Sequence, residues 1–188
     1  MNAVRTINGI ELPSAGEWEI DPGHAEVAFI GRHFGLTKIR GRFTDVTGTV
    51  AIGDDISQSS VAVEIAMASV DSGNKTRDDH LRSDDLFDVD AHSSASFVST
   101  DVAVEGNSGQ VTGDLAIKGI TRRVVLDVEY LGFATDPWSN ERAVFSASTT
   151  IDREDWGLTW NMVLDAGGLL VSKQIRLEID VELIRQKS

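Results

Sequence analysis

The feature that most constrains the fold of this chain is a strict two-residue alternation of apolar and charged side chains near its end. From residue 175 to residue 183 every second residue is Ile, Leu or Val, and the residues between them are Arg, Glu or Asp. Successive side chains of a β-strand point to opposite faces, so this pattern predicts a strand with one buried and one solvent-exposed face. The ranges 61–67 and 124–130 repeat the alternation, which is typical of antiparallel sheets.

Weaker runs of the same type extend the pattern over most of the chain. They cover residues 16–21, 26–34, 39–52, 95–104, 110–117 and 142–151. Turn-forming residues separate the runs at 21–23, 53–55, 105–109, 118–119 and 136–137. Short strands at regular spacing predict a β-barrel or a β-sandwich, and alternation alone leaves both open.

Length and composition favour one domain. A chain of 188 residues, 41% of them hydrophobic, can bury a sizeable core, and no linker rich in Pro, Gly or Ser divides it. We therefore expect an N-terminal extension over residues 1–15 and one β domain over residues 16–188. The net charge of −13 opposes binding to nucleic acid. Because the chain has no cysteine, no signal-like start and no apolar stretch of membrane-spanning length, we expect no stable membrane insertion and a cytoplasmic location.

Between two alternating stretches lies a densely charged segment, residues 70–90, with a thin thread of apolar side chains. The apolar residues are Leu81, Leu86, Phe87 and Val89. Thr76 followed three residues later by Asp79 resembles a capping box, which predicts a short helix beginning near Arg77. The segment has apolar side chains that can be buried while its charged side chains stay in contact with water. We therefore expect it to form a helical lid over one opening of the β structure.

The histidines give little support to catalysis or metal binding. They are His24, His33, His80 and His92, and no HExxH pair, nucleophile elbow, phosphate-binding loop or dinucleotide fingerprint accompanies them. His24 and His33 are an odd number of positions apart, so in one extended strand they would face opposite sides. We expect no metal site, no cofactor and no catalytic residue, and we expect His80 to anchor the lid helix by hydrogen bonds.

The charged segment also resembles a motif of one protein family. It matches the pattern D-x-G-x-x-x-R-D-x-H-L-R-S-x-D-x-F-D from Asp71 to Asp88. Further family-like phrases occur in order at 18–21 with His24, at Phe29 with His33, and at 41–43, 113–121, 152–153 and 156–158. From about residue 16 onward, the chain is therefore similar to the YceI-like, lipocalin-like polyisoprenoid-binding proteins.

The resemblance implies an all-β fold, a single antiparallel lipocalin-like β-barrel of about eight strands with a short helical lid segment. It also implies an elongated apolar pore that binds, sequesters or carries a long isoprenoid-type lipid, such as a prenyl phosphate, a prenyl alcohol or an isoprenoid quinone. A long tail would supply most of the affinity, because each methylene group removed from water contributes about 0.8 kcal/mol.

We expect such a ligand to contact aromatic residues of the pore wall and polar residues of its mouth and lid. The candidates are Trp18, His24, Phe29, His33, Phe43, His80, Arg82, Phe87, Phe97, Phe145, Ala147, Trp156 and Trp160. Ala147 is included because it is small and shares its strand face with Phe145. The expected partner is an isoprenoid or other long-chain lipid, and a homodimer is compatible with the chain. Two alternatives stay open: a lipid-modifying enzyme with a histidine base, and a solidly packed stress or interaction module.

Overall fold

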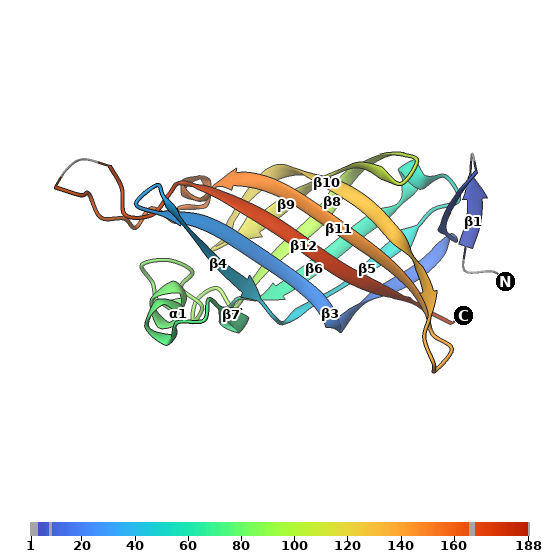
Figure 1. The fold of residues 1–188 in the computed structure, drawn as a ribbon, viewed down its shortest axis with the longest axis horizontal. Coiled ribbons are helices and arrows are strands. Elements are labelled where there is room, and N and C mark those ends of the chain that lie inside the picture. Colours follow the sequence, from blue (N-terminus) through green and yellow to red (C-terminus); the bar gives the residue numbers. More distant parts are fainter. Residues whose placement is uncertain (1–3, 8, 166–167, 188) are drawn as a thin grey trace.

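The protein is an elongated β-barrel with an α-helix at one end (Figure 1). A computed structural model describes residues 4–7, 9–165 and 168–187. The barrel strands are β3 (Gly16–His33), β4 (Thr37–Phe43), β5 (Val46–Ile52), β6 (Ser60–Ala66), β8 (Ser94–Glu105), β9 (Ser108–Ile117), β10 (Ile120–Thr135), β11 (Glu141–Asp152) and β12 (Gln174–Arg185). The remaining elements are β1 (Val4–Ile7), β2 (Ile10–Pro13), β7 (Val70–Asp71), α1 (Lys75–Arg82) and the short 3₁₀ helices η1 (Ile56–Gln58), η2 (Met67–Ser69) and η3 (Arg153–Trp156).

The barrel strands form an antiparallel meander that closes on itself. The order β5-β6-β8-β9-β10-β11-β12 places each strand beside the next, and β12 returns to pair with β3. On its other edge, β3 pairs with β5 through its first residues and with β4 through its last residues. Because β4 and β5 together fill one place, the described residues form eight positions around the barrel. This arrangement confirms the predicted fold class.

Two predicted boundaries are wrong. The turn expected at 21–23 is absent, because β3 runs on and accommodates residues 21–24 as a bulge opposite Glu182 of β12. The range 39–52, expected as one strand, breaks at Thr44 and Asp45. Their backbone N–H groups donate to Ser69 Oγ at 3.2 and 3.1 Å. The bulge in β3 depends on its pairing with β12, and the break at 44–45 depends on the acceptor oxygen of Ser69. Both partners are distant in sequence, so local sequence patterns do not predict these features.

Two tight hairpins lie where the sequence predicted turns. Lys118 and Gly119 join β9 to β10, and their φ angles are 50° and 74°. Positive φ at both central residues is the type I′ geometry, which matches the twist of paired strands. Gly106 and Asn107 form the equally short link between β8 and β9.

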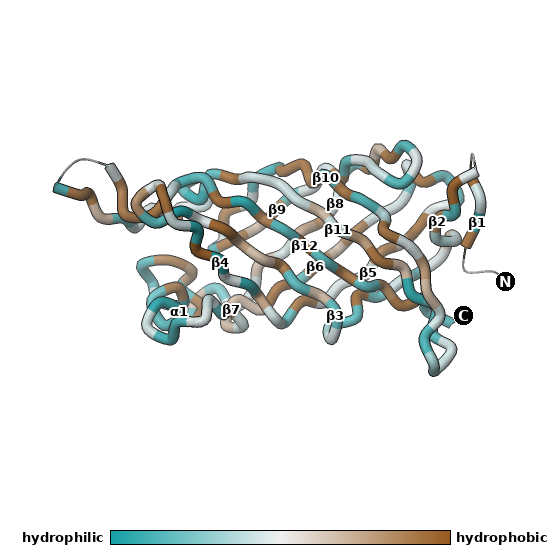
Figure 2. Tube along the Cα trace, in the orientation of Figure 1, coloured by the Kyte–Doolittle hydropathy of each residue, from teal (hydrophilic) through white to brown (hydrophobic). Residues whose placement is uncertain are grey.

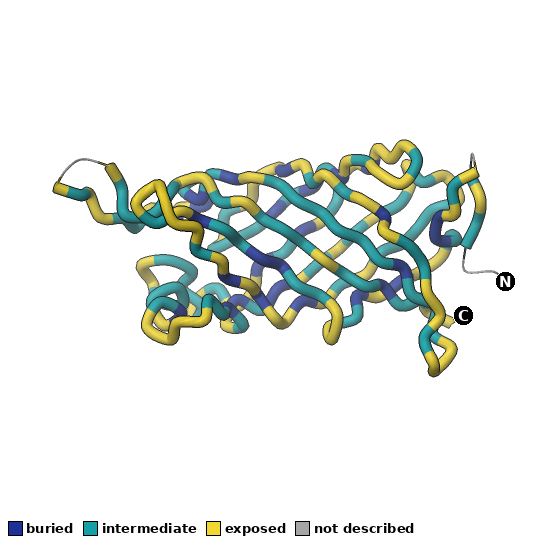
Figure 3. Tube along the Cα trace, viewed as in Figure 1, coloured by how far each residue is buried: buried dark blue, intermediate teal, exposed yellow. Residues whose placement is uncertain are grey.

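The interior follows the alternation read from the sequence. Figure 2 shows short hydrophobic and hydrophilic stretches following one another along the barrel strands, and Figure 3 shows buried positions interspersed in the same way. The largest fully buried side chains are Trp18, Trp156, Leu183, Val46 and Val70. Burial of one large apolar side chain stabilises the fold by about 1.5–3 kcal/mol, so these positions anchor the barrel.

Different elements cover the two ends of the barrel. α1 lies at one end, and the hairpin of β1 and β2 lies at the other, near the end of β12 (Figure 1). The N-terminal extension predicted over residues 1–15 therefore contributes a hairpin that packs on the barrel. Leu12 of this hairpin is 5% exposed and belongs to the same buried cluster as Trp18 and Tyr130.

Candidate functional site

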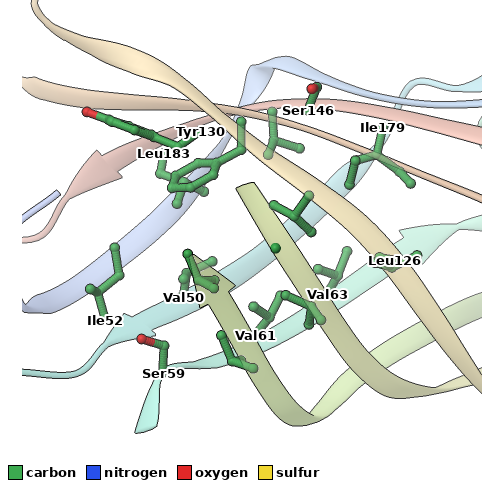
Figure 4. Close-up of a pocket in the computed structure, with 18 of the residues that line it drawn as sticks. Val50, Ile52, Ser59, Val61, Val63, Leu126, Tyr130, Ser146, Ile179 and Leu183 are labelled. Carbon is green, nitrogen blue, oxygen red and sulfur yellow. The ribbon is translucent and has the colours of Figure 1, made fainter. Parts of the chain in front are cut away.

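A cavity of about 230 Å³ lies inside the barrel (Figure 4). It is lined at one end by Val27 and Val46, next to the α1 end of the barrel, and at the other by Leu12 and Pro13 of the hairpin. Its wall is mainly aliphatic and includes Val50, Ile52, Val61, Val63, Leu126, Ile179 and Leu183. Such a wall offers dispersion contacts and few hydrogen bonds, so it suits an apolar molecule.

The alternation that predicted the strands also places these side chains inside. β12 contributes Leu177, Ile179, Val181 and Leu183 to the cavity wall, and β6 contributes Val61, Val63 and Ile65. The charged residues between them face outward, where Glu178 pairs with Arg40 at 2.6 Å. One periodicity therefore produces both the apolar interior and the charged outer surface.

Phe97, Phe145 and Ala147 are the predicted site residues that line the cavity. Phe145 and Ala147 share the inner face of β11, as their spacing predicted, and Ala147 lies between Val128 of β10 and Ile179 of β12. These three residues are therefore placed to contact a molecule inside the barrel.

The two buried tryptophans among the candidates lie in the core rather than in the cavity wall. Trp18 and Trp156 are 0% and 2% exposed. Their indole N–H groups donate to the carbonyl oxygens of Ser14 at 3.2 Å and of Leu115 at 3.0 Å. Both indole rings are thus packed in the core, and each indole N–H group has a hydrogen-bond acceptor.

Three candidate phenylalanines fill the α1 end of the barrel instead of lining the cavity. The ring of Phe43 lies between those of Phe29 and Phe87, with centroid distances of 5.5 and 5.7 Å. Leu81 and Val89 pack against the same cluster. The segment 70–90 therefore covers one barrel end as predicted, and it does so with a packed aromatic layer.

The polar candidates of this segment hold the segment itself in place. Arg82 donates from Nε to the carbonyl oxygen of Ala68 at 3.0 Å and from Nη2 to that of Val70 at 2.7 Å. His80 Nε2 lies 3.0 Å from a carboxylate oxygen of Asp85, which fits the predicted anchoring role. Neither residue lines the cavity, so their contacts indicate a structural contribution.

The start of α1 differs from the prediction. Asn74, rather than Thr76, caps the helix, because its side-chain oxygen accepts from the backbone N–H of Arg77 at 3.0 Å.

Trp160 lies outside the cavity and packs its ring edge-on against His80 at a centroid distance of 4.4 Å. No helix within the described ranges has the length and apolar character needed to cross a membrane.

His24 and His33 also lie away from the cavity. His24 Nδ1 is 2.8 Å from a carboxylate oxygen of Asp21, and the His33 ring packs on Phe34 with a centroid distance of 3.9 Å. Asp21, His24 and Glu182 bring three potential metal-ligating atoms within 4.8 Å of one another. A guanidinium already serves two of these groups, because Arg142 Nη1 lies 2.6 Å from Asp21 and 2.9 Å from Glu182.

This ion-pair network also changes the acidity of its carboxyl groups. Hydrogen bonding from Arg142 lowers the pKa of Asp21 to about 2. Burial alone would raise the pKa of Asp136, but hydrogen bonds from Asn140 and Arg142 lower it to about 2. Stable carboxylates around a fixed arginine form a structural clamp and are poorly suited to proton transfer near neutral pH.

Most of the cavity wall was missing from the sequence candidates. The sequence candidates are mainly aromatic side chains, whereas the wall consists largely of Val, Ile and Leu at the inward positions of alternating strands. The alternation itself was the signal that would have found them. The polar residues of the lining are Arg5 of β1, Ser59 after η1, Asn107 and Ser108 of the β8–β9 hairpin, Tyr130 of β10 and Ser146 of β11, and no local pattern connects these positions.

Comparison with known proteins agrees with this architecture. A UPF0312 protein of Pectobacterium atrosepticum is 38% identical over 100% of this chain and 96% of its own length. The crystal structure of BcnA from Burkholderia cenocepacia is similar with a TM-score of 0.75 and 23% identity, over 87% of this chain and 98% of BcnA. A polyisoprenoid binding domain from Saccharophagus degradans is similar with a TM-score of 0.65 and 16% identity, over 92% of this chain and 100% of that domain. At these identities the two structures show a shared fold.

The family assignment rests on most of the barrel. The model of the YceI-like domain matches residues 18–183, which run from near the start of β3 to near the end of β12. The charged segment 70–90 and the later phrases that suggested the resemblance all fall inside this range. The chain belongs to the YceI-like family.

Proposed function

We propose that this protein binds a lipid with a long isoprenoid-type chain inside its barrel. The observation that carries the proposal is the aliphatic cavity of about 230 Å³ between the strands. Each methylene group moved from water into such a space contributes about 0.8 kcal/mol, so the cavity favours a long hydrocarbon chain over a polar metabolite.

The isoprenoid character of the chain is proposed on family grounds. The cavity wall requires only a long apolar chain, and membership of the YceI-like family favours a polyisoprenoid among such chains. The Saccharophagus domain is described as polyisoprenoid-binding, but the likeness to it extends to the fold alone. The ligand class is therefore argued from the wall of this cavity together with the family.

A binding role has more support than a catalytic one. Among the described residues, those lining the cavity include no histidine, aspartate or glutamate. These are the commonest general acids and bases, and Tyr130 in the lining keeps its proton because burial raises the pKa of its hydroxyl. The open interior also favours a binding protein over a solidly packed module. We therefore propose that the lipid is held unchanged.

Native mass spectrometry of protein purified from its own cells without detergent tests this function. We expect a folded species that carries the mass of one lipid, and loss of that mass after unfolding in urea. Delipidated protein should then bind geranylgeraniol saturably. Absence of a co-purified lipid, together with no binding of geranylgeraniol to the folded delipidated protein, would contradict the proposal.

A further inference from the structure

Exposed apolar side chains gather on two neighbouring segments at the α1 end of the barrel. Phe34 and Leu36 lie in the turn between β3 and β4, and Met162 and Val163 lie in the loop between η3 and β12. Each of these side chains is at least 50% exposed. Both segments project beyond the barrel wall at the same end of the molecule (Figure 1). Single exposed apolar side chains are common, but four on adjoining segments form a patch, which we call the apolar tip.

Backbone hydrogen bonds tie the two segments of the apolar tip together. Phe34 N–H donates to the carbonyl oxygen of Leu170 at 3.0 Å, and Leu170 N–H donates to that of Met162 at 2.9 Å. At the base of the tip, Ser172 N–H donates to the carbonyl oxygen of Arg32 at 3.0 Å. The loop therefore continues the edge of the sheet beside β3, and the tip is one hydrogen-bonded structure.

The turn between β3 and β4 has a backbone conformation that disfavours phenylalanine. Phe34 and Gly35 have φ angles of 56° and 71°, and Leu36 N–H donates to the carbonyl oxygen of His33 at 3.0 Å. This is the type I′ geometry, in which Asn, Asp or Gly usually precedes the glycine. A bulky residue at positive φ stores backbone strain, and the half-exposed ring recovers little of that cost by burial. Such strain persists mainly where a residue serves a function.

Two cations flank the same turn. Arg32 of β3 lies directly opposite Lys38 of β4, and both are exposed, although like charges in this position are unfavourable. Arg32 Nη1 donates to the carbonyl oxygen of Leu36 at 3.1 Å, which holds the guanidinium beside the turn. Neither cation has an ion-pair partner among the described residues, unlike Arg40 further along β4. The turn therefore presents apolar side chains first and unpaired positive charge directly behind them.

We propose that the apolar tip docks on the surface of a lipid bilayer. In this arrangement the four apolar side chains enter the boundary between head groups and acyl chains, and Arg32 and Lys38 meet the phosphate groups outside it. A bilayer presents acyl chains and phosphates in this same order of depth. The docking is peripheral and reversible, because only the tip enters the lipid.

The charge of the protein limits the kind of bilayer that is suitable. The net charge of −13 and the exposed Asp165 of the loop oppose a strongly anionic surface. Zwitterionic lipids carry the same phosphate group without a net negative charge. We therefore infer a zwitterionic surface, on which acyl chains contact the tip and phosphates contact the two cations.

Docking by this tip brings the α1 end of the barrel to the membrane. Trp160, in the same loop as Met162, packs against His80 of α1, so the tip and the segment 70–90 are neighbours. The residues of the tip do not line the cavity. The inference therefore goes beyond the proposed function, because it states how the protein meets a membrane whatever the barrel holds.

Flotation with phosphatidylcholine vesicles tests the docking. We expect the natural protein to float with the vesicles, and Leu36→Gln combined with Val163→Thr to lower the partition coefficient about tenfold, because two apolar contacts are lost. Trp138→Ser is the matched control. Trp138 is 78% exposed, as Leu36 is, but lies between β10 and β11 at the opposite end of the barrel (Figure 1). It should keep the natural partition coefficient.

Phe34→Asn separates docking from folding. Asparagine is favoured in this turn, so the melting temperature should rise by about 2–4 °C, while the partition coefficient should fall about fivefold because the ring is lost. A purely structural ring would not give both changes. A lower melting temperature in Phe34→Asn would assign the ring to the fold and remove it from the tip.

The vesicle outcomes also separate this inference from the proposed function. An unchanged partition coefficient in Leu36→Gln with Val163→Thr, or an equal loss in Trp138→Ser, would overturn the tip. Absence of vesicle binding by the natural protein would overturn the bilayer as its partner, and a dimer in sedimentation that the double variant dissociates would assign the tip to a second copy of the chain. Binding of geranylgeraniol is measured separately, so each of these results leaves the proposed function standing.

Discussion

The α1 end of the barrel is filled by the rings of Phe29, Phe43 and Phe87 and covered by the segment 70–90, whereas the opposite end is covered by one short hairpin. The buried carboxylate of the α1 end is well paired. Asp78, which is 7% exposed, accepts from the backbone N–H of Ser72 at 2.9 Å and from its hydroxyl at 2.5 Å. Packing and hydrogen bonding therefore support each other at this end.

The hairpin end has fewer supports. β1 and β2 have four residues each, and hairpins of two strands are at best marginally stable on their own. Two of the three buried side-chain donors that lack a partner among the described residues, on Arg5 and Tyr130, also lie here. Local opening occurs where few buried contacts oppose it. We therefore predict that the hairpin end opens more readily than the α1 end, although both ends cover the same cavity.

The largest effect should come from breaking the aromatic layer at the α1 end. Phe87→Ala removes a ring that packs against Phe43, and we expect it to lower the free energy of unfolding by about 3 kcal/mol. Urea unfolding followed by tryptophan fluorescence measures this change. Val98→Ala, at a position that is 53% exposed, is the control and should cost less than about 0.5 kcal/mol. A loss below about 1 kcal/mol for Phe87→Ala would mean that the layer is not essential to this end.

A double variant of the same layer tests the lid predicted from the sequence. If the segment 70–90 controls ligand escape, Leu81→Ala combined with Phe87→Ala should speed dissociation of a bound prenyl alcohol while the barrel stays folded. Unchanged dissociation rates in a folded variant would remove the lid role and leave a purely structural cover.

A smaller and more local effect is expected at the hairpin. Leu12→Ala should weaken the contact of β1 and β2 with the barrel by about 2 kcal/mol, because Leu12 is the buried anchor of the hairpin. Hydrogen exchange of the hairpin amides should then accelerate by about 30-fold, while the amides of β12 stay protected. Equal acceleration in β12 would show that the hairpin unfolds only with the whole barrel, and the contrast between the ends would be lost.

The sequence predicted the parts of this contrast that arise from local patterns. The alternation in 175–183 was sufficient for β12, because its inward residues repeat without interruption. The helix in the segment 70–90 was also predictable, but its start was not. Asn74 and Thr76 are both good capping residues, and the choice between them depends on how the chain leaves β7.

The lining of the cavity and the space inside it were less predictable, because both depend on cross-strand neighbours. Phe29 lies over Gly41 and Phe97 lies over Gly113, so in each pair the glycine makes room for the ring. A small residue thus does not by itself mark free space. Arg5 and Tyr130 lie far apart in the sequence, and only the closed barrel places them in one wall. Polar atoms of this kind leave no periodic signal in a sequence.

The next prediction concerns the cavity between the two ends. Ala147→Phe places a ring halfway along β11, between Val128 and Ile179, and should divide the space. We expect affinity for geranylgeraniol to fall about tenfold and affinity for geraniol to fall less than about twofold, because only the longer tail must pass the ring. Ser148→Phe is the matched control, because Ser148 pairs with the charged Asp127 and Glu178 on the outer face.

Both variants must be compared as folded proteins, because overpacking costs about 1–3 kcal/mol. In the natural protein, affinity should rise with each added isoprene unit until the cavity is filled. Equal affinity for geraniol and geranylgeraniol would contradict a long tail site and leave a shallow one.

The smallest effect should be a pH dependence of stability that arises at the hairpin end, where the β10–β11 loop also lies (Figure 1). Hydrogen bonding with Arg142 lowers the pKa of Asp21 to about 2, from an ordinary value of 3.8. Asp136 reaches about 2 as well. A carboxyl group with a lowered pKa in the folded state stabilises that state above pH 4, and this contribution is lost as the pH falls from about 4 to about 2.

Arg142→Met should therefore be less stable than the natural protein at neutral pH and should lose less stability between pH 4 and pH 2. Urea unfolding at several pH values measures both changes. Arg122→Met is the control, because the Arg122 guanidinium donates to the backbone carbonyl of Thr121. The side chains of Arg142, Asp21 and Asp136 are 14%, 15% and 8% exposed, and water and salt screen their charges in part. Parallel pH curves for Arg142→Met and the natural protein would show that the clamp does not hold this end, and the weakness of the hairpin end would then lie in its packing alone.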